Sequence, residues 1–307
     1  LKMAIQYFHN QAQQKNKIVA LEGAYHGDTF GSMSVGERGT FNAAYEEFLF
    51  EVAFIDFPCE KNFEDVKKHF EALVSKGDVA AFLFEPLVQG AGGMRMYSAE
   101  HLDELVGIAH KHNVICVADE VMTGFGRTGK DFACLHLQNQ PDIMCLSKGL
   151  TGGAMAMGAT SCSDKIVQAF RSENLKKTFF HSHSYAANPL ACAVGNASLD
   201  LYLKEECTQN RLRIAQQHQN FLEKHGKHPK LREIRQQGII LAMEIENEEQ
   251  TSYFNNERNR LYNYFLEKNI LMRPLGNIIY ILPPYIISNE ELATIYEAIL
   301  ELLNEHL

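Results

Sequence analysis

The chain has 307 residues, a formal net charge of −9 at pH 7, 46% hydrophobic residues and 22% charged residues. This composition is typical of a globular protein with one large or two modest domains, and the acidic balance argues against binding to nucleic acid or to an anionic membrane surface. No apolar run approaches the roughly 18 residues that a membrane span requires.

The cysteines and the N-terminus indicate a cellular compartment. The seven cysteines form no CxxC pair, and several lie inside apolar runs, where buried thiols are common. The N-terminus lacks the long apolar stretch of a signal peptide, so a reducing cytoplasm is the expected location. Leu1 opens directly into a helical pattern without a cap, so we expect further residues upstream.

The N-terminal part of the chain alternates between strand and helix patterns. Apolar runs predict strands at 17–23, 51–58, 79–87, 114–118, 142–146 and 151–163. Helical spacing predicts helices at the N-terminus, over 62–75, after an N-cap at Ser98, and over 189–204. This alternation favours βαβ units and therefore an α/β fold with a mostly parallel sheet.

The pattern changes in the C-terminal part. Here we predict a helix over 208–225, two strands within 231–246, a helix near 255–268, a strand pair over 270–286 and a last helix capped by Asn289. The sequence therefore predicts a large domain over 1–205 and a smaller C-terminal α+β domain over 206–307.

Two of the predicted strands lead into charged residues. VICVA (114–118) ends at Asp119, and DIMCL (142–146) is followed by Ser147 and Lys148. In open α/β sheets, binding sites gather at the carboxyl ends of the strands. Taken alone, Asp119 could be a salt-bridge partner or a helix cap, and Lys148 could be an ordinary surface lysine. Together they offer what pyridoxal phosphate needs: an acid for the ring nitrogen and an amine for a Schiff base.

A glycine-rich loop lies between these two residues. GFGRTGK (124–130) satisfies both the dinucleotide pattern GxGxxG and the P-loop pattern GxxxxGK. Asp131 stands where a P-loop needs Ser or Thr, and the nearby acids precede the glycines instead of following them. We therefore favour a tight loop at the rim of a site, with Arg127 as an anion contact, and keep a nucleotide-binding module as an alternative.

Three further segments carry possible binding groups. Tyr25, in YHGD, suits either a simple turn or a stacking platform. Arg273, between apolar residues, suits either a structural ion pair or a clamp for a carboxylate. HSHSY (181–185) contains an HxH pair without a third ligand at recognisable spacing, so we expect no metal and favour a loop that contacts an anion.

Taken together, these motifs resemble the class III, pyridoxal-phosphate-dependent aminotransferases. The resemblance rests on ADEVMTGFGRTGK, LSKGLTGG and HSHSYAANPLACA. Within the class, YHGDTFGSMSVG, EPLVQGAGGMRMY and MRPLGNIIYILPPY are similar to the adenosylmethionine–8-amino-7-oxononanoate aminotransferases of biotin biosynthesis. The resemblance implies an aspartate-aminotransferase-like fold (type I), a homodimer, and amino transfer from S-adenosylmethionine, or from lysine as in related enzymes, to 8-amino-7-oxononanoate. Another class III ω-amino-acid aminotransferase and a catalytically silent dimerising fragment are the alternatives.

The same resemblance implies roles for single residues at the cofactor. Lys148 would be the Schiff-base lysine and proton shuttle, and Asp119 would pair with the ring nitrogen. Val121 and Tyr25 would cover the two faces of the ring. His183 and Ser184 would reach the cofactor phosphate of the neighbouring subunit, although a Pro-Thr pair is common at these positions in the family. The family's glycine-serine phosphate cup would lie upstream of Leu1.

The resemblance also implies contacts with the substrate. Arg273 would receive the substrate carboxylate, and Tyr25, Lys148, Ser182 and Arg127 would border the substrate. Supporting positions are implied for Glu85, Asp28 and Tyr280.

Overall fold

The computed structural model describes residues 1–247, 251 and 255–306. Its main sheet has six strands, in the order β2-β1-β3-β6-β7-β8. The strands are β1 (Lys17–Leu21), β2 (Ala53–Ile55), β3 (Val79–Phe84), β6 (Ile115–Asp119), β7 (Ile143–Leu146) and β8 (Ala159–Cys162). The first five are parallel to their neighbours, and β8 runs antiparallel to β7. The prediction of a mostly parallel sheet is therefore confirmed.

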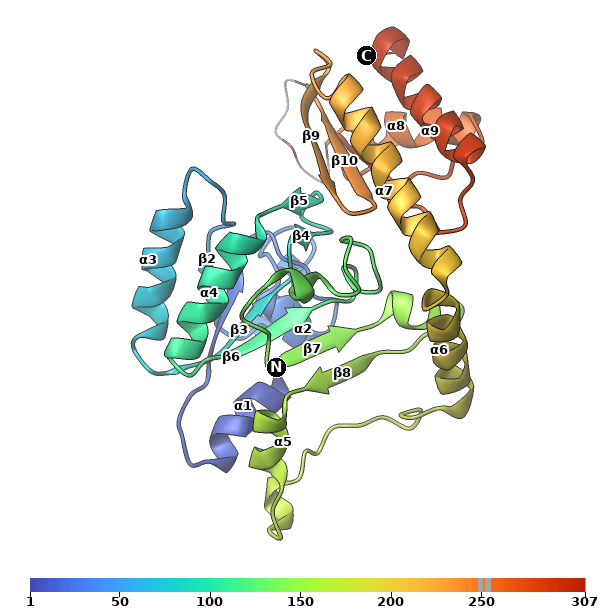
Figure 1. The fold of residues 1–307 in the computed structure, drawn as a ribbon. Helices are drawn as coiled ribbons and strands as arrows, with labels where there is room; N and C mark the ends of the chain where they lie inside the picture. Colours follow the sequence, from blue (N-terminus) through green and yellow to red (C-terminus); the bar gives the residue numbers. More distant parts are fainter. Residues whose placement is uncertain (248–250, 252–254, 307) are drawn as a thin grey trace.

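Helices cover both faces of this sheet (Figure 1). On one face, α3 (Phe63–Val74) and α4 (Ala99–Lys111) pack against side chains such as Phe82 of β3 and Cys116 of β6. On the other face, α1 (Lys2–Asn10) and α5 (Asp164–Phe170) pack against the alternate side chains of the same strands. Because both faces are covered, the central strands are apolar throughout, and their apolar runs could be recognised in the sequence.

Several short elements of this region were not predicted. These are α2 (Phe30–Val35), the 3₁₀ turns η1 (Ala43–Phe48), η2 (Ala133–His136), η3 (Lys148–Thr151) and η4 (Leu175–Lys177), the hairpin of β4 (Val88–Gln89) and β5 (Arg95–Met96), and α5. They are too short to show a clear hydrophobic period. The strand predicted over 151–163 is wrong in its first half, where Gly152 and Gly153 adopt positive φ and turn the chain.

The C-terminal part builds a second sheet. Helices α6 (Pro189–Tyr202) and α7 (Glu205–His225) lead into β9 (Leu231–Gln237) and β10 (Ile240–Ile245), followed by α8 (Glu257–Glu267), β11 (Ile278–Ile281), α9 (Asn289–Glu301) and the π turn η5 (Leu302–His306). The three strands are antiparallel, in the order β11-β10-β9. In Figure 1 this sheet and its helices lie beyond the carboxyl ends of the parallel strands. The division of the chain at residue 205 stays a prediction.

Two details of this part differ from the prediction. The strand pair expected over 270–286 is one strand, β11, because Gly276 adopts a φ of 63° and Leu275 turns back to bridge Ile278. The last helix is capped by Ser288 and not by Asn289, through a capping box with Glu291. Among the described helices, none is long and apolar enough to cross a membrane.

Candidate active site

The carboxyl ends of four parallel strands meet at one cavity of about 610 Å³. The segment after β1 contributes Tyr25 and His26, and β3 leads into Glu85. The ends of β6 and β7 bring Asp119 and Lys148 into the same lining. Parallel strands deliver their ends to one edge of a sheet, so residues distant in the sequence become neighbours here.

Lys148 is held in an unusual backbone conformation at the mouth of this cavity. It is the first residue of η3, directly after β7, and its φ is 44°. A non-glycine residue in the left-handed region is strained, and such strain persists where the surroundings enforce it, often at functional sites. The next residue, Gly149, packs so closely on Phe125 that a Cβ atom would lie 2.8 Å from its ring. The loop therefore presents an exposed amine on a tightly packed base.

Asp119 is paired with a residue to which the sequence analysis assigned no role. Oδ2 of Asp119 accepts a hydrogen bond from Nδ1 of His26 at 2.8 Å, and Oδ1 accepts from the Val121 backbone N–H at 3.2 Å. His26 is almost fully buried, and its Nε2 has no hydrogen-bond partner in the described part of the chain. The signal for His26 was indirect, because a buried acid needs a partner and His26 directly follows the predicted Tyr25.

Glu85 fixes the position of Tyr25 by a hydrogen bond to its backbone. Its two carboxylate oxygens accept hydrogen bonds from the backbone N–H groups of Tyr25 at 3.1 Å and Gly90 at 2.9 Å. Burial raises the pKa of Glu85 above its usual value, although both N–H groups oppose this shift. The Tyr25 hydroxyl donates to Asp28 at 3.0 Å. Tyr25 therefore lies over the cavity with both its backbone and its ring oxygen held.

The opposite wall of the cavity comes from the second sheet. Arg273, Leu275, Tyr280 and Leu282 line the cavity from β11 and the segments beside it. Arg273 is exposed and has no hydrogen bond or ion pair within the described residues. A guanidinium without a partner beside a cavity is available for a carboxylate ligand.

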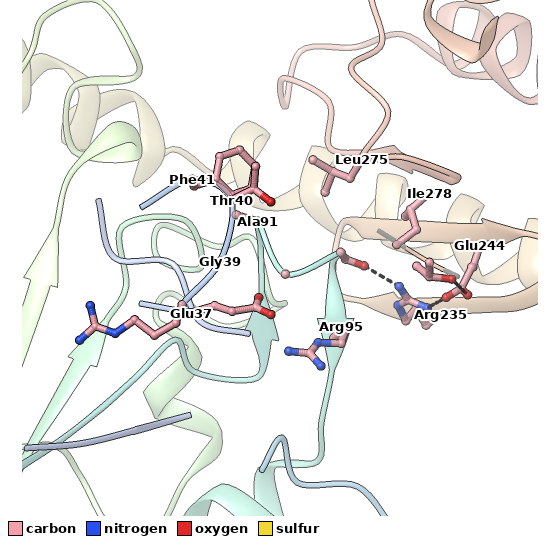
Figure 2. A pocket seen from close by; sticks show the side chains of 14 residues that line it. Glu37, Gly39, Thr40, Phe41, Ala91, Arg95, Arg235, Glu244, Leu275 and Ile278 are labelled. Atoms are coloured by element: carbon pink, nitrogen blue, oxygen red, sulfur yellow. Dashed lines mark hydrogen bonds and ion pairs between the residues drawn. The ribbon is translucent and has the colours of Figure 1, made fainter. Parts of the chain in front are cut away.

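A second cavity of about 500 Å³ adjoins the first, and the two share Ala91 and Leu275 (Figure 2). On its far side, Arg235 of β9 donates to the carbonyl groups of Gly93 and Met94, the latter at 2.8 Å. Arg235 also lies 3.6 Å from Glu244. These contacts fasten the loop between β4 and β5, which forms part of both cavities, to the second sheet.

Arg127 lies outside the lining of the main cavity. Its Nη1 donates to the Pro283 carbonyl at 2.8 Å, and its guanidinium stacks on Tyr285 at 4.7 Å. The surrounding GFGRTGK loop is not a nucleotide fingerprint in its structure. The N–H of Gly126 bonds to the Asp131 carbonyl, and the next element is the short 3₁₀ turn η2 instead of a helix. The substrate contact expected of Arg127 stays a prediction.

The segment 182–184 also lies apart from the cavity and is exposed. Within it, Nδ1 of His183 accepts a hydrogen bond from the Tyr185 N–H at 3.1 Å. The Ser182 hydroxyl donates to the His183 carbonyl at 3.4 Å. Within one chain, the structure therefore brings together Tyr25, Asp119, Val121, Lys148 and Arg273, but not Ser182, His183, Ser184 or Arg127.

The donor set of the cavity fits pyridoxal phosphate. The cofactor ring nitrogen needs an acid, its aldehyde needs a primary amine, and its flat ring needs apolar contacts on both faces. Asp119, Lys148, Val121 and Tyr25 supply these groups within one lining. The unpartnered Nε2 of His26 is a further buried polar atom that a bound group could satisfy.

Comparisons with known proteins identify the family of the chain. The family model described as aminotransferase class III matches residues 1–303. An adenosylmethionine-8-amino-7-oxononanoate aminotransferase from Synechococcus elongatus is 45% identical over 313 residues, covering 99% of this chain and 73% of the relative. The enzyme of the same name from Helicobacter pylori is 34% identical, covering 97% and 70%.

Solved structures are similar over nearly the whole chain. The crystal structure of adenosylmethionine-8-amino-7-oxononanoate aminotransferase from Methanocaldococcus jannaschii has a TM-score of 0.89 at 32% identity, covering 98% of this chain and 72% of that one. An amine transaminase from an uncultivated Pseudomonas species, in its PLP-bound form, has a TM-score of 0.86 at 26% identity, covering 97% and 71%.

Proposed function

The chain belongs to the class III aminotransferases, and we propose that its reaction is the amino transfer of biotin biosynthesis. The acceptor would be 8-amino-7-oxononanoate, the product 7,8-diaminononanoate and the amino donor S-adenosylmethionine. The observation that carries the proposal is the shared cavity of Lys148, Asp119 and Arg273. The names of the curated relatives from Synechococcus elongatus and Helicobacter pylori support the choice of substrates.

Pyridoxal 5′-phosphate would be held through Lys148, Asp119, Val121 and Tyr25. When bound, it supplies an aldehyde for attachment and an electron-withdrawing ring that stabilises negative charge on the substrate carbon. Asp119 would favour the protonated form of the ring nitrogen, because a nearby carboxylate favours a positive charge. His26 holds that carboxylate in place through the 2.8 Å contact.

Lys148 carries the proton chemistry. Its Nζ is a primary amine on a flexible four-carbon side chain. The side chain is long enough for Nζ to move between the two positions that exchange the proton while the backbone stays fixed. In each half of a ping-pong reaction, Nζ takes a proton at one position and returns it at another, as a general base and then a general acid. The strained backbone at φ 44° aims the side chain into the cavity at a fixed place.

Arg273 selects the substrate by its far end. Its guanidinium offers paired N–H donors, which match the two oxygens of a carboxylate. The carboxylate of 8-amino-7-oxononanoate lies at the end of an apolar chain, and Leu275 and Leu282 provide apolar wall between Arg273 and the strand ends. The phosphate contact would come from His183 and Ser184 of a neighbouring subunit.

A homodimer would place that exposed segment beside a second site. Large apolar side chains are exposed on α6, at its C-cap and on the segment before it: Leu175, Phe180, Tyr185, Leu190, Leu199, Leu201 and Leu203. Such a concentration of apolar surface is typical of a subunit interface. A cytoplasmic location is supported by the seven cysteines, which are all free thiols.

The proposal is tested by an amino-transfer assay and by chemical trapping. With pyridoxal phosphate present, we expect formation of 7,8-diaminononanoate from S-adenosylmethionine and 8-amino-7-oxononanoate. Borohydride reduction should fix the cofactor on the peptide that contains Lys148. Lys148→Ala should lose both activity and trapping, and Lys61→Ala, a change of an exposed lysine, should lose neither.

Two results would argue against this function. Trapping that persists in Lys148→Ala would refute the assignment of the lysine. Efficient transfer to other ω-amino-acid substrates without activity on 8-amino-7-oxononanoate would place the chain elsewhere in class III.

A further inference from the structure

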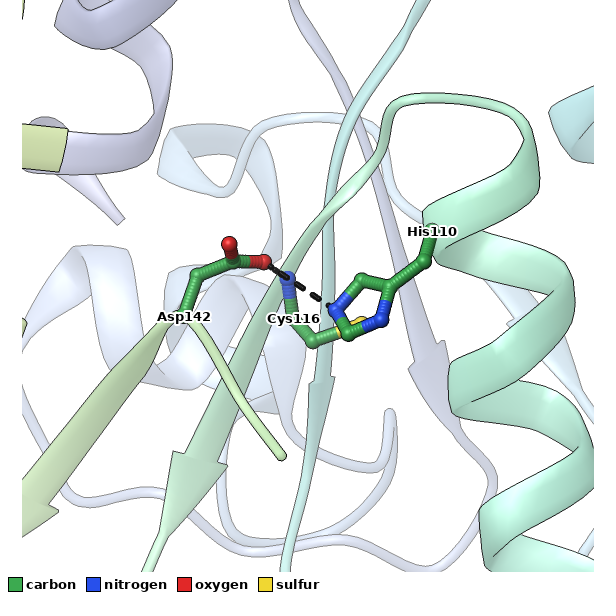
Figure 3. A group of neighbouring side chains, drawn as sticks. All are labelled: His110, Cys116 and Asp142. Atoms are coloured by element: carbon green, nitrogen blue, oxygen red, sulfur yellow. Dashed lines mark hydrogen bonds and ion pairs between the residues drawn. The ribbon is translucent and has the colours of Figure 1, made fainter. Parts of the chain in front are cut away.

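Three side chains of types that bind metals meet at the amino ends of β6 and β7. The active site lies at the other, carboxyl end of the same strands. Cys116 is the second residue of β6, whose last residue is Asp119. Asp142 directly precedes β7, and His110 lies in the last turn of α4. Figure 3 shows the three side chains facing one another. Their candidate ligand atoms all lie within 4.8 Å of one another.

Contacts around the cluster fix the carboxylate. Oδ2 of Asp142 accepts a hydrogen bond from the Cys116 N–H at 2.9 Å, and the Asp142 N–H donates to the Cys116 carbonyl. Oδ1 lies 3.3 Å from Nζ of Lys165. These two contacts orient Asp142 so that Oδ2 faces the imidazole and the thiol.

His110 has an unused coordinating atom at this place. Its Nε2 lies 3.5 Å from Oδ2 of Asp142, without hydrogen-bond geometry. This nitrogen is shielded from solvent and has no hydrogen-bond partner among the described residues. Its one polar contact among these residues is the ion pair with Asp142, so in the neutral imidazole this nitrogen keeps a lone pair directed toward the carboxylate and the thiol (Figure 3) and can bind a metal.

A catalytic role for these residues is excluded by burial. A Cys-His-Asp group could act as a nucleophile with its base, but the Cys116 side chain is fully buried and no substrate could reach it. Burial also raises the pKa of the Cys116 thiol well above its usual value, which disfavours the nucleophilic thiolate.

We propose that His110, Cys116 and Asp142 bind a zinc-type transition-metal ion at the amino ends of β6 and β7. Imidazole, thiolate and carboxylate are the ligands of zinc sites, whereas magnesium and calcium prefer oxygen alone. With metal–ligand distances near 2.0–2.3 Å, tetrahedral ligands lie about 3.5 Å apart, so the three atoms would close by little more than about 1 Å.

The expected ion differs from the prediction of no metal drawn from the sequence. The residues at 110, 116 and 142 match no familiar ligand spacing, and the pairing of β6 with β7 and the packing of α4 on β6 bring them together. On binding, the Cys116 thiol releases its proton to solvent and the sulfur bonds to the metal. A water on the partly exposed His110 side would complete the coordination. The site would fasten α4 to the two strands and take no part in amino transfer.

The test uses Co²⁺ as a spectroscopic probe of the full chain carrying its cofactor. Tetrahedral Co²⁺ with a thiolate ligand has strong visible d–d absorption, at longer wavelengths than the cofactor bands. After treatment with a chelator, we expect one Co²⁺ per chain with this spectrum, and Zn²⁺ should displace it. His110→Gln should weaken Co²⁺ binding at least about tenfold, because a ligand is lost. Cys116→Ser should abolish the thiolate signature.

Cys134→Ser is the matched control, since Cys134 is a second buried thiol that is not a member of the cluster. This variant should keep both the spectrum and the affinity. His110 lies at the surface end of the cluster, so its variant is expected to fold even where Cys116→Ser does not. The weak spectrum of octahedral Co²⁺, or equal Co²⁺ affinity in the wild-type chain and His110→Gln, would overturn the proposal. Zn²⁺ should also raise the melting temperature of the wild-type chain and leave that of His110→Gln unchanged.

Discussion

Nδ1 of His26 donates a hydrogen bond to Oδ2 of Asp119 across 2.8 Å, and this contact joins the segment after β1 to the end of β6. The His26 side chain is only 3% exposed, so the pair is shielded from water. A hydrogen bond to a charged group in such a place contributes about 1.5–3 kcal/mol. The contact therefore fixes the carboxylate of Asp119, which we propose as the partner of the cofactor ring nitrogen.

Replacing His26 should weaken catalysis without removing cofactor attachment. Among the described residues, His26→Leu leaves the Asp119 carboxylate with the Val121 N–H as its one hydrogen-bond partner, so we expect kcat to fall by about 10- to 100-fold. His26→Asn can still donate and should recover much of that loss. The pH dependence of cofactor absorbance should shift in His26→Leu and return toward wild type in His26→Asn. Unchanged kcat and spectra in both variants would show that the contact is only structural.

Arg273→Met should act on substrate binding. Because a charged contact to the carboxylate is lost, we expect the KM for 8-amino-7-oxononanoate to rise by about 10- to 100-fold. The KM for the methyl ester of that substrate, which has no carboxylate, should change little. The control is Arg260→Met, because Arg260 pairs with Glu257 on α8 and does not line the cavity. Equal increases in KM for the acid and for its methyl ester would show that Arg273 does not bind the substrate carboxylate.

Gly149→Ala should misplace Lys148. The new Cβ would lie 2.8 Å from Cδ2 of Phe125, inside a packed contact, and overpacking of this kind costs about 1–3 kcal/mol. We expect slower borohydride trapping at Lys148 and a lower kcat, measured beside Gly39→Ala, where a Cβ meets open space. Phe125→Leu in the same chain should restore part of the activity. The idea fails if Gly149→Ala traps cofactor at the wild-type rate.

His218 predicts how stability depends on pH. It is fully buried between α7, β10 and α9, with Nδ1 2.6 Å from the Tyr296 hydroxyl and Nε2 3.1 Å from the Ile239 carbonyl. Burial lowers its pKa from 6.5 to about 4. Between pH 6.5 and pH 4, His218 is therefore protonated in the unfolded chain and neutral in the folded chain. The stability present above pH 6.5 is lost as the pH falls toward 4.

The shift in the pKa of His218 corresponds to a loss of about 3 kcal/mol in the free energy of unfolding. Urea unfolding between pH 7 and pH 4 should show a shallower loss of stability in His218→Gln than in the wild-type chain. His9→Gln, which changes an exposed histidine, should follow the wild-type curve. Parallel curves for His218→Gln and the wild-type chain would contradict the assignment.

The sequence predicted the parts of the site that depend on strands buried on both faces. Asp119 and Lys148 follow apolar runs, and the rule that parallel strands share an edge was enough to place them together. His26 received no role, because its partner is distant in sequence and only folding reveals the contact. Arg127 was predicted at a site rim, but the attachment of its loop to Pro283 and Tyr285 depends on how the second sheet packs.

The sequence predicted the long elements of the fold and missed the short ones. Long elements with a clear period, such as α3 and α4, lie where the sequence predicted them. The β4–β5 hairpin and α5 are too short for a period to emerge. The second strand predicted within 270–286 does not form, because Gly276 in the left-handed region turns the chain where the apolar pattern would continue.

The two walls of the cavity rest on different hydrophobic cores. Lys148 and Asp119 extend from strands of the parallel sheet, whereas Arg273 follows Met272, which packs in the core beneath the antiparallel sheet. Substitutions in that second core can therefore change the distance between Arg273 and Lys148, and with it the length of the cavity between them, without altering the strands that carry Lys148 and Asp119.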